Sequence, residues 1–253
     1  MNKVKKIAIL NYKGGVGKTT TTVNLAAALT LLKKKVLVVD TDAQRNTTLI
    51  LDNNKEVDVS GGTLHDAISG GEMAIYSHNG SIDFIAGDIR LANIEGTLAN
   101  YSGIKEFKLK NILKSVEADY DYILIDCPPN HGLMTKMALY AVDSIIIPID
   151  SQIMALDGLN DITRTLVEVK SSDMNNDLKI EGFLLTRYRA QLQTAKSVLN
   201  FLKGTEHHVF NARIRENTTV GQAPGARMTI FEYDNKCAGA EDYMQLAREI
   251  IKN

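Results

Sequence analysis

Short apolar runs alternate along the chain with longer segments in which apolar residues recur at helical spacing. The runs are typical of buried strands and lie at 7–10, 36–39, 82–86, 120–126, 144–149 and 178–186. The helical spacing predicts helices at 21–32, 89–98, 104–116, 157–169, 191–202 and 238–250. Strands that alternate with helices in this way build parallel sheets. The pattern therefore predicts an α/β fold, with a mainly parallel, doubly wound sheet and helices on both faces.

The weakest pattern lies in the segment 43–82. Pairs of turn residues stand at 53–54 and 61–62, and a short helix is predicted to start within 63–66. His65 and His78 are predicted to be surface residues, because neither has a second ligand at metal-binding spacing. The sequence assigns this segment no role.

A glycine-rich turn, Asn-Tyr-Lys-Gly-Gly-Val-Gly-Lys-Thr-Thr at 11–20, joins the first predicted strand to the first predicted helix. Glycines let backbone N–H groups curl around an anion, and the helix that follows points its positive end at the same anion. The context is that of a phosphate-binding loop. Lys18 is positioned to reach β- and γ-phosphates, and the Thr19 hydroxyl to bind Mg²⁺. The residues predicted to hold the nucleotide here are Gly14, Gly15, Val16, Gly17, Lys18, Thr19 and Thr20.

The loop departs from the pattern G-x-x-x-x-G-K-[ST] in an informative way. Tyr12 stands where the first glycine would be, and a second lysine, Lys13, follows it. Most lysines are solvated surface charges, so one interpretation of Lys13 is a solvated charge on the loop. A cation beside a phosphate site favours a functional interpretation, because the flanking strand and helix both fit.

Carboxylates follow two other predicted strands. Asp40 and Asp42 come directly after the strand at 36–39, at the sheet edge where open α/β folds bind ligands. A helix or turn cap is the alternative, but one cap would account for only one aspartate. Asp126 ends the run at 120–126, where a carboxylate can hold a Mg²⁺-bound water beside phosphates. Cys127 is predicted to be a small buried core residue.

Together these motifs resemble the ParA/MinD ATPases. Lys-Gly-Gly-Val-Gly-Lys-Thr-Thr at 13–20 resembles the deviant Walker A motif of that family, and Asp-Cys-Pro-Pro at 126–129 resembles its Walker B wording. The family's Asp-x-Asp-Pro-Gln reads Asp-Thr-Asp-Ala-Gln at 40–44, and 239–247 resembles its closing segment.

The resemblance implies a P-loop NTPase that binds ATP and Mg²⁺ and forms an ATP-dependent homodimer. It implies that Lys13 crosses the dimer interface to the partner's nucleotide and that Asp42 orients the attacking water. Asp40 and Asp126 would support Mg²⁺ through its water shell, beside Thr19. Lys13, Lys18 and Asp42 are thus the predicted catalytic residues.

Composition and charge set further bounds. With 253 residues, 44% of them hydrophobic and 23% charged, the chain fits one globular domain over 1–253. No apolar run is long enough for a membrane helix, and the apolar run at 7–10 is too short for a signal peptide, so a cytoplasmic protein is expected. The two cysteines are too few for a disulfide framework.

Positive charge gathers in one segment of a chain whose net charge is −1. The segment 187–227 carries +5 and the remainder −6, which suggests a basic surface for an anionic partner, with a merely solvated face as the alternative. In the resembling family, ATP-bound dimers bind DNA without sequence preference through arginines of this third. The candidate DNA contacts are Arg187, Arg189, Arg213, Arg215 and Arg227.

The carry-over of the DNA contacts is imperfect. The family's Ile-Pro-Arg-Asn-x-Arg reads Ile-Arg-Glu-Asn-Thr-Thr at 214–219, so its two arginines fall on Glu216 and Thr219. Asn217 keeps its place, and the resemblance puts it near the adenine.

The function that the resemblance implies is DNA partition. A ParB-like adaptor on a centromere would trigger ATP hydrolysis, and the ATP-bound dimer would associate with the nucleoid and not with a membrane. The alternative within the family is a MinD-like membrane-cycling ATPase. One alternative outside the family is an iron–sulfur reductase, but neither Cys127 nor Cys237 stands at the position of its cluster ligands. Another is a nucleotide-gated scaffold without turnover, and the presence of Lys18, Asp42 and Asp126 argues against it.

Overall fold

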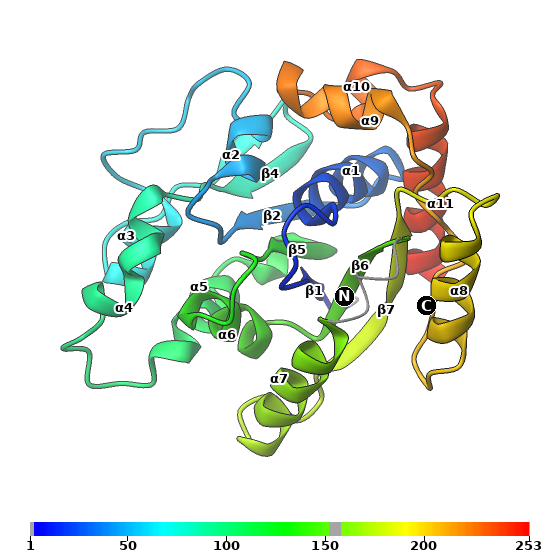
Figure 1. The fold of residues 1–253 in the computed structure, drawn as a ribbon. Helices are drawn as coiled ribbons and strands as arrows, with labels where there is room; N and C mark the ends of the chain where they lie inside the picture. The colour runs from blue at the N-terminus through cyan, green and yellow to red at the C-terminus, as the bar shows by residue number, and fades with distance from the viewer. Residues whose placement is uncertain (1–2, 152–157, 253) are drawn as a thin grey trace.

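A single seven-stranded sheet organises the chain, in the order β3-β4-β2-β5-β1-β6-β7 (Figure 1). The computed structural model describes residues 3–151 and 158–252. All neighbouring strands run parallel except β3, which pairs antiparallel with β4. The strands are β1 (Lys5–Ile9), β2 (Val36–Asp40), β3 (Tyr76–His78), β4 (Ile82–Ile85), β5 (Tyr122–Asp126), β6 (Ser144–Asp150) and β7 (Lys179–Thr186).

Helices cover both faces of this sheet. The longer ones are α1 (Lys18–Leu31), α5 (Lys108–Lys114), α6 (Leu133–Ala141), α7 (Leu159–Ser171), α8 (Gln193–Lys203) and α11 (Ala238–Lys252). Short helices are α2 (Asn46–Leu51), α3 (Leu64–Ser69), α4 (Ile94–Thr97), α9 (Thr218–Gln222) and α10 (Ile230–Tyr233). Single 3₁₀ turns are η1 (Ile89–Asn93), η2 (Lys105–Phe107), η3 (Glu117–Asp119) and η5 (Ala223–Ala226).

Alternation along the strands divides the core in two. In β1, Ala8 packs into one cluster with α5, α6 and α7, while Ile7 and Ile9 pack into another with α1 and α11. Successive side chains of a strand point to opposite faces, so a strand buried on both faces is apolar throughout. Figure 1 shows α1, α10 and α11 on one side of the sheet and α5, α6 and α7 on the other. The doubly wound, mainly parallel fold is confirmed.

Most predicted elements are present, with shifted ends. The helix predicted at 89–98 is instead the 3₁₀ turn η1 followed by α4, because the Asp88 side chain caps η1 at the Arg90 N–H and Asn93 leaves helical geometry between them. The helix predicted at 104–116 likewise begins as the 3₁₀ turn η2. The start predicted at Asp157 lies outside the described residues, and α7 is described from Leu159.

The surface prediction for the two histidines is wrong. His78 is 1% exposed, and its ring contacts residues of both α2 and α10. Its Nδ1 lies 2.8 Å from the Leu51 carbonyl oxygen and its Nε2 lies 2.9 Å from Glu232 Oε1. The side chain of His65 is also mostly covered, at 12% exposed. Buried polar groups require partners, and for His78 these come from distant parts of the chain.

The contact between His78 and Glu232 shifts both groups. Burial lowers the pKa of His78, but its hydrogen bonds to Glu232 and Leu51 and the charge of Glu232 outweigh this effect and raise that pKa above its usual value. Burial raises the pKa of Glu232, but hydrogen bonds from His78 and Thr229 lower it to about 2. The pair therefore favours charged Glu232 opposite protonated His78 and fastens α10 to β3.

The carboxyl ends of the central strands meet at one edge of the sheet. Asp126 of β5 is in register with Ile9 of β1 on one side and with Asp40 of β2 on the other. The glycine-rich loop leaves β1 at this same edge. In the described part of the chain, no helix has the length and apolar character required to cross a membrane.

Candidate functional site

The glycine-rich loop has the backbone shape of an anion cradle. Gly15 and Gly17 have φ angles of 72° and 91°, in the left-handed region that favours glycine. Gly17 is also the N-cap of α1, whose first residue is Lys18. The N-terminus of a 14-residue helix therefore opens onto the loop, with unpaired N–H groups and the positive end of the helix dipole.

The two lysines of the loop differ in their surroundings. Lys18 is 8% exposed, and its Nζ donates to the Lys13 carbonyl oxygen at 3.2 Å. Burial lowers the pKa of Lys18, while the negative charge of Asp126 opposes the shift. Lys13 is half-buried, with its backbone N–H donating to Asn11 Oδ1 at 2.9 Å. Lys18 thus lies in the site, and the role of Lys13 at a partner's site stays a prediction.

Asp126 lies opposite the loop and is 1% exposed. Its Oδ2 accepts hydrogen bonds from the hydroxyls of Thr19 and Thr47, each at 2.7 Å. Its Oδ1 is buried and has no hydrogen-bond partner among the described residues. Burial raises the pKa of Asp126, and the hydroxyl bonds and Lys18 oppose the shift.

Asp40 is the second buried carboxylate and is fully covered. Its Oδ2 accepts from both the N–H and the hydroxyl of Thr48, at 2.8 and 2.7 Å, and its Oδ1 accepts from the Asp42 N–H at 3.2 Å. Burial and the neighbouring charge of Asp126 raise the pKa of Asp40.

These oxygens fit a divalent cation. Asp126 Oδ1, which no described residue pairs, a second carboxylate and the Thr19 hydroxyl form the all-oxygen donor set that Mg²⁺ prefers. Two carboxylates buried side by side also favour a positive charge between them.

Asp42 lies on the turn after β2 and is half-buried. Its Oδ1 accepts from the Gln44 N–H at 2.9 Å, so the turn-capping interpretation holds for one of its oxygens. The residue lines a cavity of about 540 Å³ that also borders Pro128 and the start of α6. A carboxylate with one oxygen held by its turn can use the other to orient a water.

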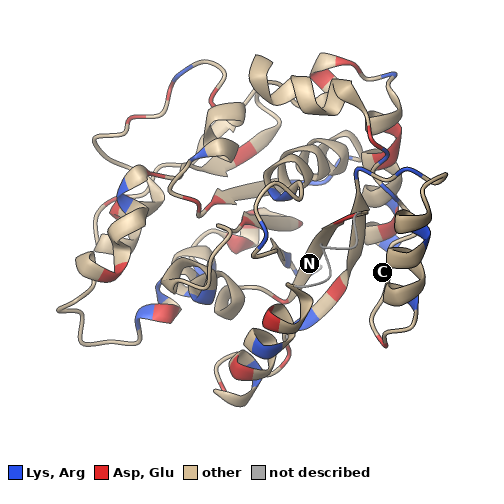
Figure 2. Cartoon of the chain, in the orientation of Figure 1, with Lys and Arg blue, Asp and Glu red and all other residues tan. Residues whose placement is uncertain are grey.

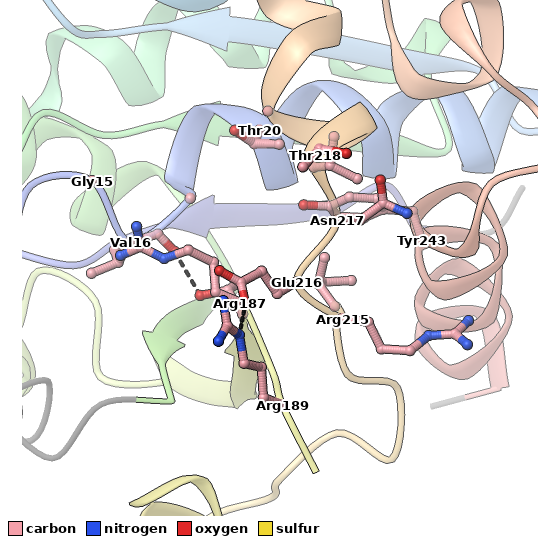
Figure 3. A pocket seen from close by; sticks show the side chains of 15 residues that line it. Gly15, Val16, Thr20, Arg187, Arg189, Arg215, Glu216, Asn217, Thr218 and Tyr243 are labelled. Atoms are coloured by element: carbon pink, nitrogen blue, oxygen red, sulfur yellow. Dashed lines mark hydrogen bonds and ion pairs between the residues drawn. The ribbon is translucent and has the colours of Figure 1, made fainter. Parts of the chain in front are cut away.

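A second cavity, of about 500 Å³, adjoins the loop on its other side (Figure 3). Gly15, Gly17 and Thr20 line it from the loop, and Asn217 and Tyr243 line it from the C-terminal part of the chain. Asn217 caps α9, with its Oδ1 accepting from the Thr219 N–H at 2.8 Å. The cavity has the volume of a small-ligand site, and the place of Asn217 near an adenine stays a prediction.

The predicted DNA-contact arginines do not share one environment. Three of them line this cavity and are paired with carboxylates: Arg187 with Asp150, Arg189 with Glu216, and Arg215 with Glu241 and Asp242. Figure 3 shows Arg187, Arg189 and Glu216 grouped below Val16.

The other two arginines are not among the residues that line this cavity. Arg213 lies over the Tyr188 ring at 4.9 Å from its centroid, and Arg227 has a left-handed backbone with φ 55° at the end of η5. Figure 2 shows positive and negative residues intermingled in this part of the molecule.

Residues that the sequence reasoning missed include Thr47 and Thr48. Two hydroxyl residues stand five and six positions after Asp42, a short-range signal for side chains that bond carboxylates. Their partners, Asp126 and Asp40, lie 79 and 8 residues away in the sequence. The contact between Thr47 and Asp126 depends on the tertiary fold, whereas the contact between Thr48 and Asp40 is local in sequence.

Comparisons with known proteins agree with this geometry. The family described as an AAA domain matches residues 4–180. The chromosome partitioning protein ParA of Myxococcus xanthus is 37% identical over 251 residues, covering 97% of this chain and 87% of that protein. The sporulation initiation inhibitor protein Soj of Bacillus subtilis is 38% identical over 258 residues, covering 98% and 99%.

A solved structure with bound nucleotide has a similar fold. Cobyrinic acid a,c-diamide synthase from Mycobacterium smegmatis, with bound ATP analog and magnesium, has a TM-score of 0.85 and 28% identity, covering 98% of this chain and 94% of that one. Fold, phosphate loop, buried carboxylates and relatives lead to one assignment: the chain belongs to the ParA/Soj family of P-loop ATPases.

Proposed function

We propose that the chain, as one domain over 1–253, is a DNA-partition ATPase that binds ATP with Mg²⁺ and closes into a homodimer. The observation that carries the ATPase site is the contact of Thr19 and Thr47 with Asp126. It joins the phosphate loop to a buried carboxylate whose other oxygen has no partner in the part of the chain that the structure describes. Relatives named for chromosome partitioning, at 34–37% identity, support the cellular role.

The chain's own residues divide the chemistry of hydrolysis. The N–H groups of the loop would hold the phosphates, and Lys18 would contribute positive charge beside them. Thr19, Asp40 and Asp126 would hold Mg²⁺, the two carboxylates through water, and the bound ion would neutralise charge on the phosphate oxygens. Asp42 would orient the attacking water. Asn217 would lie beside the adenine in the 500 Å³ cavity.

Lys13 supports the dimer in this proposal. The side chain is half-buried on the outer turn of the loop, and no ion pair holds it among the described residues. A lysine free to extend from this turn could reach a nucleotide bound by a second copy facing the loop. Closing two such sites would then require ATP in both.

DNA binding would follow from the pairing of two basic segments, 187–227 of each copy, in the dimer. The candidate contacts remain Arg187, Arg189, Arg213, Arg215 and Arg227, but three of these line the nucleotide cavity. Lys196 and Lys203 are exposed on α8, seven positions apart, and form no ion pair within 3–151 and 158–252. They offer phosphate contacts whose removal leaves the cavity intact.

The test is a titration of the protein with DNA of unrelated sequences, in ATP, in ADP and without nucleotide. We expect binding in ATP alone, equal for each sequence, with log K falling by about 0.9 per log unit of salt for each phosphate neutralised. Lys196→Glu with Lys203→Glu should weaken binding without changing ATP affinity. Equal DNA affinity in all three nucleotide states would contradict the proposal.

The adaptor and the alternative function are tested in the same preparation. A ParB-like protein bound to its DNA site should raise the rate of ATP hydrolysis. ATP-dependent binding to vesicles that contain anionic lipid, without DNA binding, would favour the MinD-like alternative instead.

A further inference from the structure

The first turn of α2 holds both buried carboxylates of the site by their side chains. Thr47 donates its hydroxyl to Asp126 Oδ2 at 2.7 Å, and Thr48 donates its hydroxyl to Asp40 Oδ2 at 2.7 Å. Both threonines are almost fully buried, at 0% and 2% exposed. Adjacent residues of one short helix thus bind the ends of two neighbouring strands.

The bond from Thr47 is not the usual one for a threonine at a helix start. Such hydroxyls commonly bond to nearby backbone groups and cap the helix. Here the N-cap is Arg45, with a left-handed φ of 56° and no side-chain capping bond. The Thr47 hydroxyl instead reaches a carboxylate that is 79 residues away in the sequence.

Two hydroxyls on one oxygen leave the other oxygen of Asp126 in a defined place. Thr19 and Thr47 both donate to Oδ2, while Oδ1 is buried and has no partner among the described residues. A single hydroxyl would let the carboxylate rotate about its last torsion, which is soft. The second hydroxyl opposes that rotation and keeps Oδ1 turned from the hydroxyls.

The same helix is connected to Asp42. The Asp42 turn leads directly into α2, and the Asp42 N–H donates to Asp40, which Thr48 holds from the other side. The Gly87 N–H, just after the end of β4, donates to the Thr48 hydroxyl oxygen at 2.8 Å and holds it in place. Movement of α2 would therefore move the Asp42 turn and the carboxylates together.

We propose that Thr47 is a positioning residue for the metal site. It orients Asp126 so that Oδ1 faces the bound Mg²⁺ and its waters. Because Thr47 belongs to α2, binding of the ion would also restrain α2 and the Asp42 turn that precedes it. The inference rests on the proposed ATP and Mg²⁺ site, to which it adds a residue and a physical link. Groups that orient a metal's ligands typically change metal affinity by about 10- to 100-fold when removed.

The experiment compares Thr47→Val, which removes the hydroxyl at nearly constant volume, with Thr47→Ser, which keeps it. Binding of a fluorescent, non-hydrolysable ATP analogue is measured while Mg²⁺ is titrated, and again in EDTA. Thr47→Val should raise the half-saturating Mg²⁺ concentration by about 10-fold or more. Affinity in EDTA should be unchanged, and Thr47→Ser should restore the wild-type Mg²⁺ dependence.

A matched control is Thr135→Val. Thr135 is also buried, at 1% exposed, but its hydroxyl donates to the Asn130 backbone carbonyl and not to a carboxylate. This variant should keep the wild-type Mg²⁺ dependence. Hydrogen exchange supplies a second readout: Mg²⁺ with the analogue should slow exchange over 46–51 in the wild type and less so in Thr47→Val.

The outcomes separate the two proposals. Wild-type protein whose ATP affinity ignores Mg²⁺ would overturn the proposed metal site itself. A normal Mg²⁺ response in the wild type, together with the same response in Thr47→Val, would overturn the role of Thr47 alone. If Thr47→Val does not fold, Thr47→Ala, which leaves room for a water, is measured in its place. A wild-type Mg²⁺ response in Thr47→Ala would likewise exclude the positioning role.

Discussion

Gly239→Ala tests how closely the C-terminal helix must approach the base cavity. Gly239 lies in the first turn of α11 and is buried against α9, the short helix that carries Val220 into the cavity lining. A Cβ added at Gly239 would overlap Val220 Cγ2 and would lie 3.6 Å from Val220 Cβ. The substitution thus has two opposite effects on stability: alanine favours the helix more than glycine does, and its Cβ overlaps Val220.

Magnitudes decide the sign of this change. Alanine in place of a helical glycine gains about 1 kcal/mol. Overpacking costs about 1–3 kcal/mol, and Val220 cannot rotate away freely because β-branched side chains have one strongly preferred rotamer in helices. We expect a net loss of about 1 kcal/mol in the free energy of unfolding, or roughly 2–4 °C in Tm for a chain of this size. A displaced α9 should also weaken ATP binding.

The assay is thermal unfolding without ligand, followed by an ATP-binding titration. Gly221→Ala is the matched control for stability, because no atom of residues 3–151 or 158–252 outside its own surroundings lies within 4 Å of the added Cβ. It should be stabilising by about 0.5–1 kcal/mol. In the double variant with Val220→Ala the overlap is absent, so a coupling of about 1 kcal/mol is expected. Gly239→Ala that is as stable as the wild type, with unchanged ATP affinity, would refute the reasoning.

Three further predictions follow from the site and the core. Lys18→Ala should abolish ATP binding, whereas Lys13→Ala should bind ATP and fail to dimerise on a sizing column; equal loss of affinity in both would show that Lys13 serves its own site. Asp42→Ala should bind ATP, accumulate as dimer and hydrolyse about 10²-fold more slowly or worse, and a wild-type rate would remove its assignment. The stability due to His78 and Glu232 is fully present from about pH 4.5 to 6.5; it is lost below that range as Glu232 gains a proton and above it as His78 loses one. In denaturant titrations, His78→Gln should therefore cost more stability at about pH 6 than at about pH 9, and an equal cost would contradict the charged pair.

Local sequence was sufficient for the phosphate loop and the strand-end carboxylates. Gly15 and Gly17 have positive φ angles, which suit a loop predicted to curl its N–H groups around an anion, and Asp40 and Asp126 lie side by side at the sheet edge. Both follow from short-range rules: a glycine-rich turn between strand and helix, and parallel strands whose carboxyl ends meet at one edge. The apolar runs also predicted six of the seven strands. The exception is β3, whose three residues are too few to show a pattern.

The pairing of distant charges was decided by the tertiary structure alone. Counting charges over 187–227 gave a basic segment, but Arg187 is paired with Asp150 and Arg215 with Asp242, both outside that segment. Net charge along a chain says nothing about which carboxylates the fold brings alongside, since an ion pair depends on distance in space. His78 became a core residue for the same reason, as Glu232 reaches it across 154 positions. The sequence by itself determined the chemistry of the loop, and the fold determined which side chains hold that chemistry in place.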